Sequence, residues 1–259
     1  MSLADLAGRR TVVWGLGVEG RAAARAALQA GASDVRAVTD EPPDVETLVH
    51  WERVGLAHVP VVTGHAAGAV RRRAEVLILS PGVSRYRPEV VEAEQRDTRV
   101  TNGSALFLSE HAGRTIAVTG SKGKSTVTRL VAHLLGALGR DVVAAGNVGT
   151  SLLDLLDTDR LVVAEVSSYQ AALVHHGPSV AVLTSLFPDH LPWHGTVDRY
   201  YRDKLRLLTC QRDGQRGLAN GADPGIRAFR AVGALGGVEL SAAGHAGGRV
   251  GGGTRVCAD

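Results

Sequence analysis

The sequence predicts an α/β fold with mainly parallel sheets, arranged as two domains. Short apolar runs alternate with segments whose apolar residues recur at helical spacing, a pattern typical of parallel strands joined by helices. Two of these runs lead directly into glycine-bearing loops. A length of 259 residues suits two modest domains better than one. An amphipathic segment breaks at Gly113, so we predict a first domain over residues 1–112 and a second over residues 113–259.

The first domain opens with a strand, a glycine loop and a helix. Its predicted strands are residues 11–14, 35–39 and 76–79, and its alanine-rich helix ends near residue 29. The loop Gly15-x-Gly17-x-x-Gly20, with Asp40 twenty residues after its last glycine, matches the Rossmann dinucleotide fingerprint. This short pattern fits either a dinucleotide site or a plain Rossmann-like turn, and the residues alone leave both open.

The second domain repeats this alternation and then loses it. Its predicted strands are residues 115–119, 142–145, 161–166 and 180–186. A helix over residues 125–138 keeps Val127, Leu130, Leu134 and Leu138 at helical spacing, which predicts an apolar face. Beyond Leu208 the pattern fades into a tail rich in Gly and Ala, where we expect weak strands and an unfinished domain.

The strongest motif is TGSKGKST at residues 119–126, between an apolar strand and an amphipathic helix. Glycines let backbone N–H groups surround phosphates, and the helix N-terminus adds a favourable dipole. We expect Lys124 to reach the β- and γ-phosphates of a nucleotide and the Ser125 hydroxyl to bind Mg²⁺. The full P-loop motif has Gly where this chain has Val118, so the motif is a shortened variant. The alternative is a strand–turn–helix with incidental glycines.

Three further polar residues are candidates for the same site. Glu165 ends an apolar strand, a position that suits a Mg²⁺ ligand or a residue that holds water; a helix-capping or solvated glutamate is the alternative. His190 follows the next strand, and Lys204 comes fourteen residues later on a predicted helix. The chain has 26 Arg but only three Lys, at positions 122, 124 and 204. An amine can be carbamylated or lie as a compact charge among phosphates, and a guanidinium does neither well.

Taken in order, these motifs resemble those of the Mur ligase family, ATP-dependent enzymes that form amide bonds in peptidoglycan synthesis. The features that carry the resemblance are GLGVEG (15–20), SPGV (80–83), TGSKGKST (119–126), GNVG (146–149), EVSSYQ (165–170) and DHLPWHG (189–195) followed by YYRDKLRLL. The resemblance covers about residues 10–210. It implies a Rossmann-like N-terminal domain followed by a P-loop-containing Mur-ligase central domain. EVSSYQ and the GLG opening favour the glutamate-adding branch.

The resemblance implies a reaction and a role for each motif. ATP would phosphorylate the carboxylate of UDP-N-acetylmuramoyl-L-alanine to an acyl phosphate, which the amino group of glutamate attacks; D-glutamate is favoured and L-glutamate possible. The implied ATP-binding residues are Gly120, Ser121, Lys122, Gly123, Lys124, Ser125 and Thr126. The implied catalytic residues are Lys124, Glu165, His190 and Lys204. One Mg²⁺ would bind Ser125 and Glu165, and a second would bind His190 and a carbamylated Lys204.

The resemblance also assigns the GLGVEG loop to UDP rather than to NAD. The residues implied around the UDP-sugar are Gly15, Leu16, Gly17, Val18, Asp40, Ser80, Pro81 and Gly82, with Asn147, Ser167 and Gln170 at the sugar–alanine end. Relatives carry Thr and Arg after the acidic residue, where this chain has Glu41 and Pro42. The resemblance therefore does not assign the uracil contacts at this end.

Two hypotheses follow for the function. Family members have a third, C-terminal domain, which nothing after Leu208 supplies. The chain is then expected to be the first two domains of a glutamate-adding ligase, or else a truncated Mur-like protein that binds nucleotide or UDP-sugar without ligase activity. A folate-type ligase fits GLGVEG and SPGV poorly, since those relatives lack this N-terminal domain. An NAD-dependent oxidoreductase leaves the P-loop and Lys204 unexplained.

Composition argues against several other classes of protein. Hydrophobic residues make up 44% and charged residues 21%, which suits a folded core rather than disorder. The net charge of +3 comes from scattered basic residues, so we expect no nucleic-acid partner. The N-terminus lacks the pattern of a signal peptide, and no apolar stretch approaches about 18 residues, so we expect no secretion and no membrane insertion. The two cysteines are too few for a disulfide framework. We expect a cytoplasmic monomer.

Overall fold

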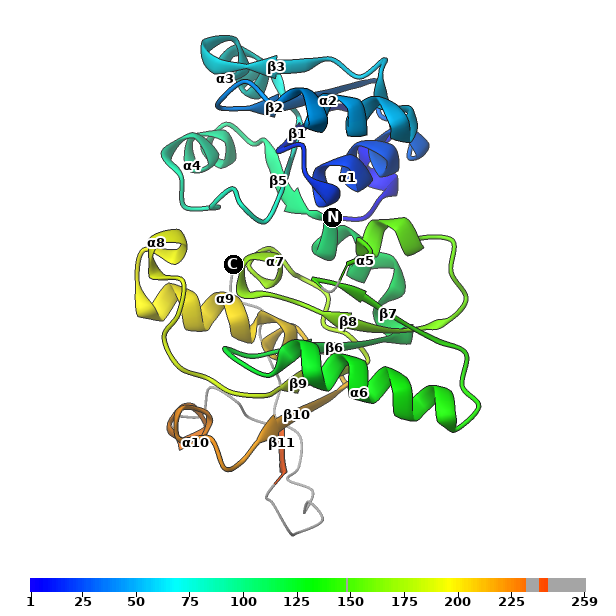
Figure 1. Cartoon of the computed structure of the whole chain (residues 1–259). Coiled ribbons are helices and arrows are strands. Elements are labelled where there is room, and N and C mark those ends of the chain that lie inside the picture. Colours follow the sequence, from blue (N-terminus) through cyan, green and yellow to red (C-terminus); the bar gives the residue numbers. More distant parts are fainter. Residues whose placement is uncertain (148, 232–237, 242–259) are drawn as a thin grey trace. The chain divides into compact units, whose positions relative to one another are not determined.

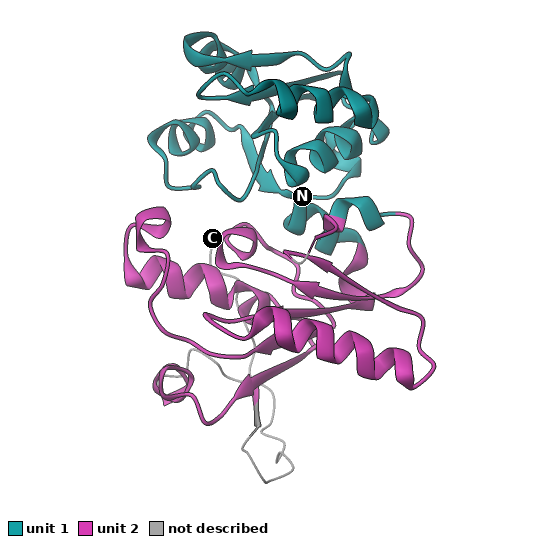
Figure 2. Ribbon diagram, viewed as in Figure 1, with its two compact units in different colours: residues 1–110, 153–156 teal, residues 111–152, 157–259 magenta. Residues whose placement is uncertain are grey.

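The chain forms two compact α/β units, each built on a parallel sheet. The structure, a computed structural model, describes residues 1–147, 149–231 and 238–241 (Figure 1). Unit 1 holds residues 1–110 and 153–156, and unit 2 holds residues 111–152 and 157–259 (Figure 2). Every pair of neighbouring described strands is parallel, which confirms the predicted fold class.

Unit 1 is organised around a five-stranded sheet in the order β3-β2-β1-β4-β5. The strands are β1 (Arg10–Trp14), β2 (Asp34–Thr39), β3 (Val61–Thr63), β4 (Val76–Leu79) and β5 (Arg99–Asn102). The helices are α1 (Val18–Gln29), α2 (Val45–Trp51), α3 (Gly64–Arg73), α4 (Pro88–Gln95) and α5 (Gly103–His111). The strand order reverses between β1 and β4, and such a switch point is where doubly wound folds bind ligands, beyond the carboxyl ends of the strands. The GLGVEG and SPGV motifs follow these two strands.

The core of unit 1 explains why its central strands read as continuous apolar runs. All four residues of β4 are buried, and so are four of the five residues of β1. Strands covered on both faces by helices need no polar alternation. The buried side of α1 is almost entirely alanine, and these small side chains let the helix pack closely on the sheet.

Unit 2 contains a six-stranded sheet in the order β11-β10-β9-β6-β8-β7 within the described residues. Its strands are β6 (Thr115–Thr119), β7 (Val142–Gly146), β8 (Leu161–Glu165), β9 (Val180–Leu183), β10 (Arg216–Asn220) and β11 (Val238–Ser241). Its helices are α6 (Lys124–Ala137), α7 (Ser168–Ala171), α8 (Leu191–His194), α9 (Val197–Thr209) and α10 (Pro224–Ala231). Among the described residues, no helix is both long and apolar enough to cross a membrane.

Three details of unit 2 differ from the sequence prediction or extend it. The strand predicted over residues 180–186 ends at Leu183, because Thr184 and Ser185 turn to bond with the loop after β6. The predicted apolar face of α6 is largely exposed: Leu130 and Leu134 are each 52% exposed and Leu138 is 77% exposed. The weak strands expected after residue 208 are found as β10 and β11. Cys210 is buried, whereas Cys257 and the rest of the glycine-rich tail lie outside the described residues.

Candidate active site

The carboxyl ends of three neighbouring strands of unit 2 form the candidate active site. Strand β6 lies between β8 and β9, so the segments that follow these strands meet at one edge of the sheet. They carry the glycine loop, the EVSSYQ motif and the DHLPWHG motif, respectively. The fold thereby gathers three motifs that are far apart in sequence.

The glycine loop after β6 has a backbone that requires glycine. Gly120 has φ 148° and Gly123 has φ 84°, both in the region that side chains disfavour. A Cβ atom on Gly120 would lie 2.0 Å from the Thr184 hydroxyl oxygen. The loop is therefore packed directly against the segment after β9.

Only part of this loop is free to bind phosphate. The Ser121 N–H donates to the Ser185 carbonyl over 3.0 Å, and the Lys122 N–H donates to the Ser185 hydroxyl over 2.9 Å. The buried Ser121 hydroxyl lies 2.8 Å from the Tyr200 hydroxyl. The next N–H groups open α6, where Gly123 is the N-cap without a side-chain cap. These first helical N–H groups have no intrahelical acceptor, and Ser125 and Thr126 beside them are exposed.

Two lysines converge on one carbonyl of the loop. The Gly120 carbonyl accepts from Lys124 Nζ over 3.0 Å and from Lys204 Nζ over 2.9 Å. Lys204, on α9, is only 1% exposed. Burial, and secondarily the positive charge of Lys124, lowers the pKa of Lys204 to about 7. Burial also lowers the pKa of Lys124, an effect that nearby Glu165 opposes.

Glu165 combines burial with an unused oxygen atom. It ends β8 and is 1% exposed. Its Oε1 accepts a hydrogen bond of 2.9 Å from the Asn147 side chain, while its Oε2 is buried with no hydrogen-bond partner in the described part of the chain. A buried carboxylate oxygen without a partner is costly unless a cation or water satisfies it. Oxygen ligands are what Mg²⁺ prefers, so Glu165 fits a metal ligand.

His190 lies in a different environment from Lys204. It is the N-cap that precedes α8, with φ 52°; its side chain is half exposed, and its Nε2 lies 3.5 Å from an Asp189 carboxylate oxygen. Its ring is 5.1 Å from that of Tyr169. None of the contacts described for either residue joins His190 to Lys204. Within the described ranges there is also no group of three or more His, Cys, Asp or Glu residues placed to hold a metal ion.

The two polar residues predicted in EVSSYQ hold the start of α7. The Ser167 hydroxyl accepts from the Gln170 N–H over 3.2 Å, and the Gln170 side-chain oxygen accepts from the Ser167 N–H over 3.0 Å. This capping box satisfies two N–H groups that the helix start would otherwise leave open. Gln170 is buried and Ser167 half-buried.

A buried hydrogen-bond network links the same motifs and was not singled out from the sequence. His194 Nδ1 lies 2.7 Å from an Asp203 carboxylate oxygen, and His194 Nε2 lies 3.0 Å from the Ser168 hydroxyl. All three residues are at most 2% exposed, so the trio holds α7, α8 and α9 together and is not accessible as a nucleophile. The only sequence signal is position: His194 shares a motif with His190, and Asp203 precedes Lys204.

In unit 1, the loop after β1 is shaped by close backbone packing. A Cβ atom on Gly20 would lie 2.0 Å from the Gly15 carbonyl oxygen, and one on Gly15 would lie 2.5 Å from the Ser80 hydroxyl. Leu16 is buried, and Gly17 is the N-cap of α1 without a side-chain cap. The start of α1 is thus open to an anion. Of the other predicted residues, Val18 is 49% exposed, and Pro81 and Gly82 lie in the turn after β4.

Asp40 is engaged by two arginines that the sequence analysis did not identify. Its carboxylate lies 2.6 Å from an Arg87 guanidinium nitrogen and 3.4 Å from one of Arg71. Both guanidinium groups stack on the Trp14 ring, with centroid distances of 4.0 Å for Arg71 and 4.6 Å for Arg87. Positive charge therefore reaches the carboxyl end of β2 from sequence positions 31 and 47 residues away from Asp40.

Comparison with known proteins gives matches over both units. The family model described as Mur ligase MurD-like, N-terminal domain, matches residues 9–102, and the one described as Mur ligase middle domain matches residues 118–249. A Micromonospora protein named UDP-N-acetylmuramoyl-L-alanine–L-glutamate ligase is 48% identical over 88% of this chain and 49% of its own length. A Salinispora tropica protein of the same name is 44% identical over 88% of this chain and 50% of its own length. The chain thus spans about half the length of these relatives.

A solved structure supports the fold independently of close sequence similarity. The UDP-N-acetylmuramate:L-alanyl-gamma-D-glutamyl-meso-diaminopimelate ligase from Neisseria meningitides superposes with a TM-score of 0.58 at 17% identity. The match covers 90% of this chain and 78% of that one.

Proposed function

This chain belongs to the Mur ligase family, and on that premise we propose that it acts in peptidoglycan synthesis, in the ATP-dependent ligation of L-glutamate to UDP-N-acetylmuramoyl-L-alanine. The names of its Micromonospora and Salinispora relatives support this substrate pair, and they support L-glutamate over the D isomer that the sequence favoured. The observation that carries the proposal is the convergence of Lys124 and Lys204 on the Gly120 carbonyl, where Lys124 also interacts electrostatically with the buried Glu165.

The loop after β6 is proposed to bind ATP. The N–H groups at the start of α6 would hold its phosphates, and Lys124 would stabilise charge on the phosphoryl group as it moves. A carboxylate oxygen of the UDP-sugar substrate attacks the γ-phosphorus, and the bond to ADP breaks. The amino group of L-glutamate then attacks the carbonyl carbon of the acyl phosphate; phosphate leaves with the bonding electron pair, and the nitrogen loses a proton to give the amide.

Mg²⁺ is proposed at two places in unit 2. Ser125 and Glu165 would hold one ion, and the buried Oε2 of Glu165 supports this assignment. His190 and a carbamylated Lys204 would hold the other. Bound Mg²⁺ supplies positive charge that neutralises the phosphoryl oxygens. A pKa of about 7 leaves much of Lys204 as the neutral amine that can add to CO₂, forming an N–C bond and releasing a proton.

The residues proposed to contact the UDP-sugar are assigned in each unit separately. In unit 1, the UDP part would contact the loop 15–18, Asp40 and the turn 80–82, a placement supported by the open N-terminus of α1. In unit 2, Asn147, Ser167 and Gln170 are assigned to the sugar–alanine end. The protein is further proposed to act in the cytoplasm as a monomer.

An assay of ADP release tests the proposal. The whole chain is incubated with Mg-ATP, UDP-N-acetylmuramoyl-L-alanine and either L- or D-glutamate, with hydroxylamine present in parallel reactions to trap the acyl phosphate. Release that requires the UDP-sugar, prefers L-glutamate and is lost in Lys124→Ala supports the proposal; Arg129→Ala, on the exposed side of α6, is the control. UDP-sugar binding without ADP release or trapped product would support the alternative of a binding protein and overturn ligation by this chain.

A further inference from the structure

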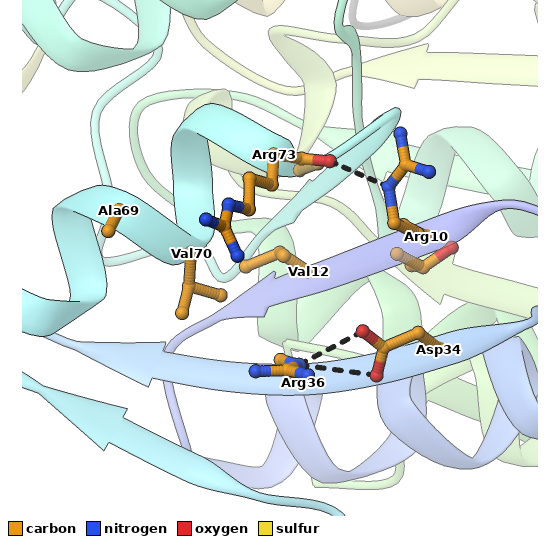
Figure 3. A pocket seen from close by; sticks show the side chains of 9 residues that line it. Arg10, Val12, Asp34, Arg36, Ala69, Val70 and Arg73 are labelled. Atoms are coloured by element: carbon orange, nitrogen blue, oxygen red, sulfur yellow. Dashed lines mark hydrogen bonds and ion pairs between the residues drawn. The ribbon is translucent and has the colours of Figure 1, made fainter.

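Unit 1 contains a cavity near the amino ends of its strands β1 and β2, whereas the GLGVEG loop follows the carboxyl end of β1. It has a volume of about 250 Å³ and lies between α3 and the neighbouring strands β1 and β2 (Figure 3). Arg10 and Asp34 line it, and these residues begin β1 and β2, whereas the nucleotide-sugar motifs follow the ends of the strands. The cavity is therefore separate from the site assigned to UDP.

The cavity has an apolar floor. Val12, which is 3% exposed, faces it from β1, and Ala69, Val70 and Ala74 line it from α3 and the residue after it (Figure 3). Small side chains at the end of α3 leave space above the sheet that a larger residue would fill. A surface of this kind favours a compact apolar group.

Three arginines surround this floor, and their charge is only partly neutralised. Arg36 Nε donates to both Asp34 carboxylate oxygens, over 3.0 and 3.2 Å. Arg10 Nε donates to the Arg73 carbonyl over 3.0 Å, and a terminal nitrogen of Arg10 lies 3.5 Å from a Glu75 carboxylate oxygen. The Arg73 side chain extends from the end of α3 toward Val12 (Figure 3), and its guanidinium has no hydrogen-bond or ion-pair partner among the residues described. Five N–H donors are thus available in a planar group that suits oxyanions.

A second, more polar cavity of about 570 Å³ adjoins the first. The two share Arg10, Arg73 and Ala74 in their linings. Six arginines and three acidic residues line the two cavities together, so the local charge is positive. These arginines are solvated, and exposed ion pairs alone contribute little. A ligand must therefore use the apolar floor as well as the charge.

We propose that this paired cavity is a binding site for a small organic phosphate monoester, with the apolar part on Val12 and Val70 and the phosphate on Arg73 and Arg10. Phosphate is preferred to a carboxylate because three oxygens can accept from more than one guanidinium. The site does not depend on the proposed ligase function, since none of its residues belongs to the motifs proposed to bind ATP or UDP.

Titration of the ¹⁵N-labelled whole chain with phenyl phosphate, followed by NMR, tests the site. The amides of residues 69–74 are expected to shift saturably, while those of residues 15–20 stay unchanged. Binding is expected to be about tenfold tighter than for inorganic phosphate or for phenol, each of which offers one half of the interaction. Absence of saturation, or equal affinity for inorganic phosphate, would overturn the proposal. Shifts confined to residues 15–20 would also overturn it, because they would place the ligand at α1.

Variants of the cavity residues distinguish specific binding in this site from nonspecific electrostatic binding to a basic surface. Arg73→Ala is expected to weaken phenyl phosphate binding about tenfold or more, because it removes the guanidinium that has no protein partner. Ala69→Leu, at an exposed position on α3, fills the floor and should weaken binding while leaving the unfolding transition unchanged. Arg53→Ala, an exposed arginine of unit 1 outside both cavities, is the matched control. Equal loss in Arg53→Ala and Arg73→Ala would contradict a specific site.

Discussion

Lys204 donates a hydrogen bond of 2.9 Å to the carbonyl of Gly120, inside the loop that begins the candidate nucleotide site. The contact joins residues 84 positions apart in sequence. It holds a buried amine against the turn that Lys124 also contacts, and the two positive charges disfavour each other. Several consequences can be measured.

The stability of the protein should depend on pH through Lys204. Its pKa is about 7 in the folded chain, against about 10.4 for an unfolded lysine. Between these values the unfolded state binds more protons, so stability rises with pH through this window, by an amount of the order of a few kcal/mol, and the burial cost is fully present below pH 7. Urea unfolding in CO₂-free buffer at pH 6.5, 8 and 9.5 measures the slope. Lys204→Met should flatten it, and an unchanged slope would show that Lys204 is not its source.

Lys204 should also be the site of carbamylation. With ¹³C-bicarbonate at pH 8, we expect one carbamate signal in the NMR spectrum, increased by Mg²⁺ and absent in Lys204→Arg. Lys122→Arg is the control, because Lys122 is exposed and its amine has no buried environment. A signal that persists in Lys204→Arg would assign the carbamate elsewhere.

The Lys204→Arg variant should also abolish acyl-phosphate formation. Activity that survives in this variant and does not respond to bicarbonate would refute the role of the carbamate.

Glu165 should contribute to the binding affinity for Mg-ATP and not to the affinity for ATP without metal. Glu165→Gln keeps an acceptor for Asn147 but removes the negative charge of the carboxylate. Calorimetry should show Mg-ATP binding weakened about tenfold or more, with affinity in excess EDTA unchanged. Equal weakening in both conditions would mean that Glu165 shapes the loop and does not hold the ion.

The buried His194–Asp203 pair should be important for stability. Removing His194 takes this hydrogen bond from the buried Asp203 and leaves a cavity where the ring was, so His194→Ala is expected to lower the free energy of unfolding by about 3 kcal/mol or more. His133→Ala, on the exposed side of α6, should change it by no more than about 0.5 kcal/mol. Similar values for the two variants would show that the network contributes nothing measurable.

A sequence pattern predicts a residue's role best where that role depends on neighbours in the chain. The apolar runs of β1, β4, β6 and β8 are buried on both faces, and glycine loops follow β1 and β6, so pattern and chemistry coincide there. Short β3 and β5, at the edges of their sheet, have too few residues to show a period.

Residues whose roles depend on distant partners escaped the sequence analysis. The ion pair of Asp40 with Arg87 spans 47 positions, and the contact of His194 with Ser168 spans 26. No local period encodes such pairs. The exposed leucines of α6 show the converse case, because helical spacing predicts which side chains share a face but not whether anything covers that face.

Alanine substitutions at two glycines of the GLGVEG loop should distinguish a residue needed for folding from a residue needed for ligand binding. At Gly20 a Cβ atom would meet the Gly15 carbonyl oxygen at 2.0 Å, so Gly20→Ala must displace backbone and should destabilise unit 1 by about 2 kcal/mol or more. At Gly17 a Cβ atom would meet nothing within 4 Å, and φ is −66°, which alanine adopts freely. Gly17→Ala should therefore change stability by no more than about 1 kcal/mol.

In Gly17→Ala, the affinity for the UDP-sugar should fall although the stability of the fold is nearly unchanged. If the start of α1 holds the diphosphate of a UDP-sugar, the added methyl group at residue 17 lies where the backbone must approach the phosphates closely. Calorimetric titration of Gly17→Ala with UDP-N-acetylmuramoyl-L-alanine should then show binding about tenfold or more weaker, although the fold is intact. Unchanged affinity in this variant would move the diphosphate away from α1, and the two arginines on Trp14 that engage Asp40 would become the next positions to test.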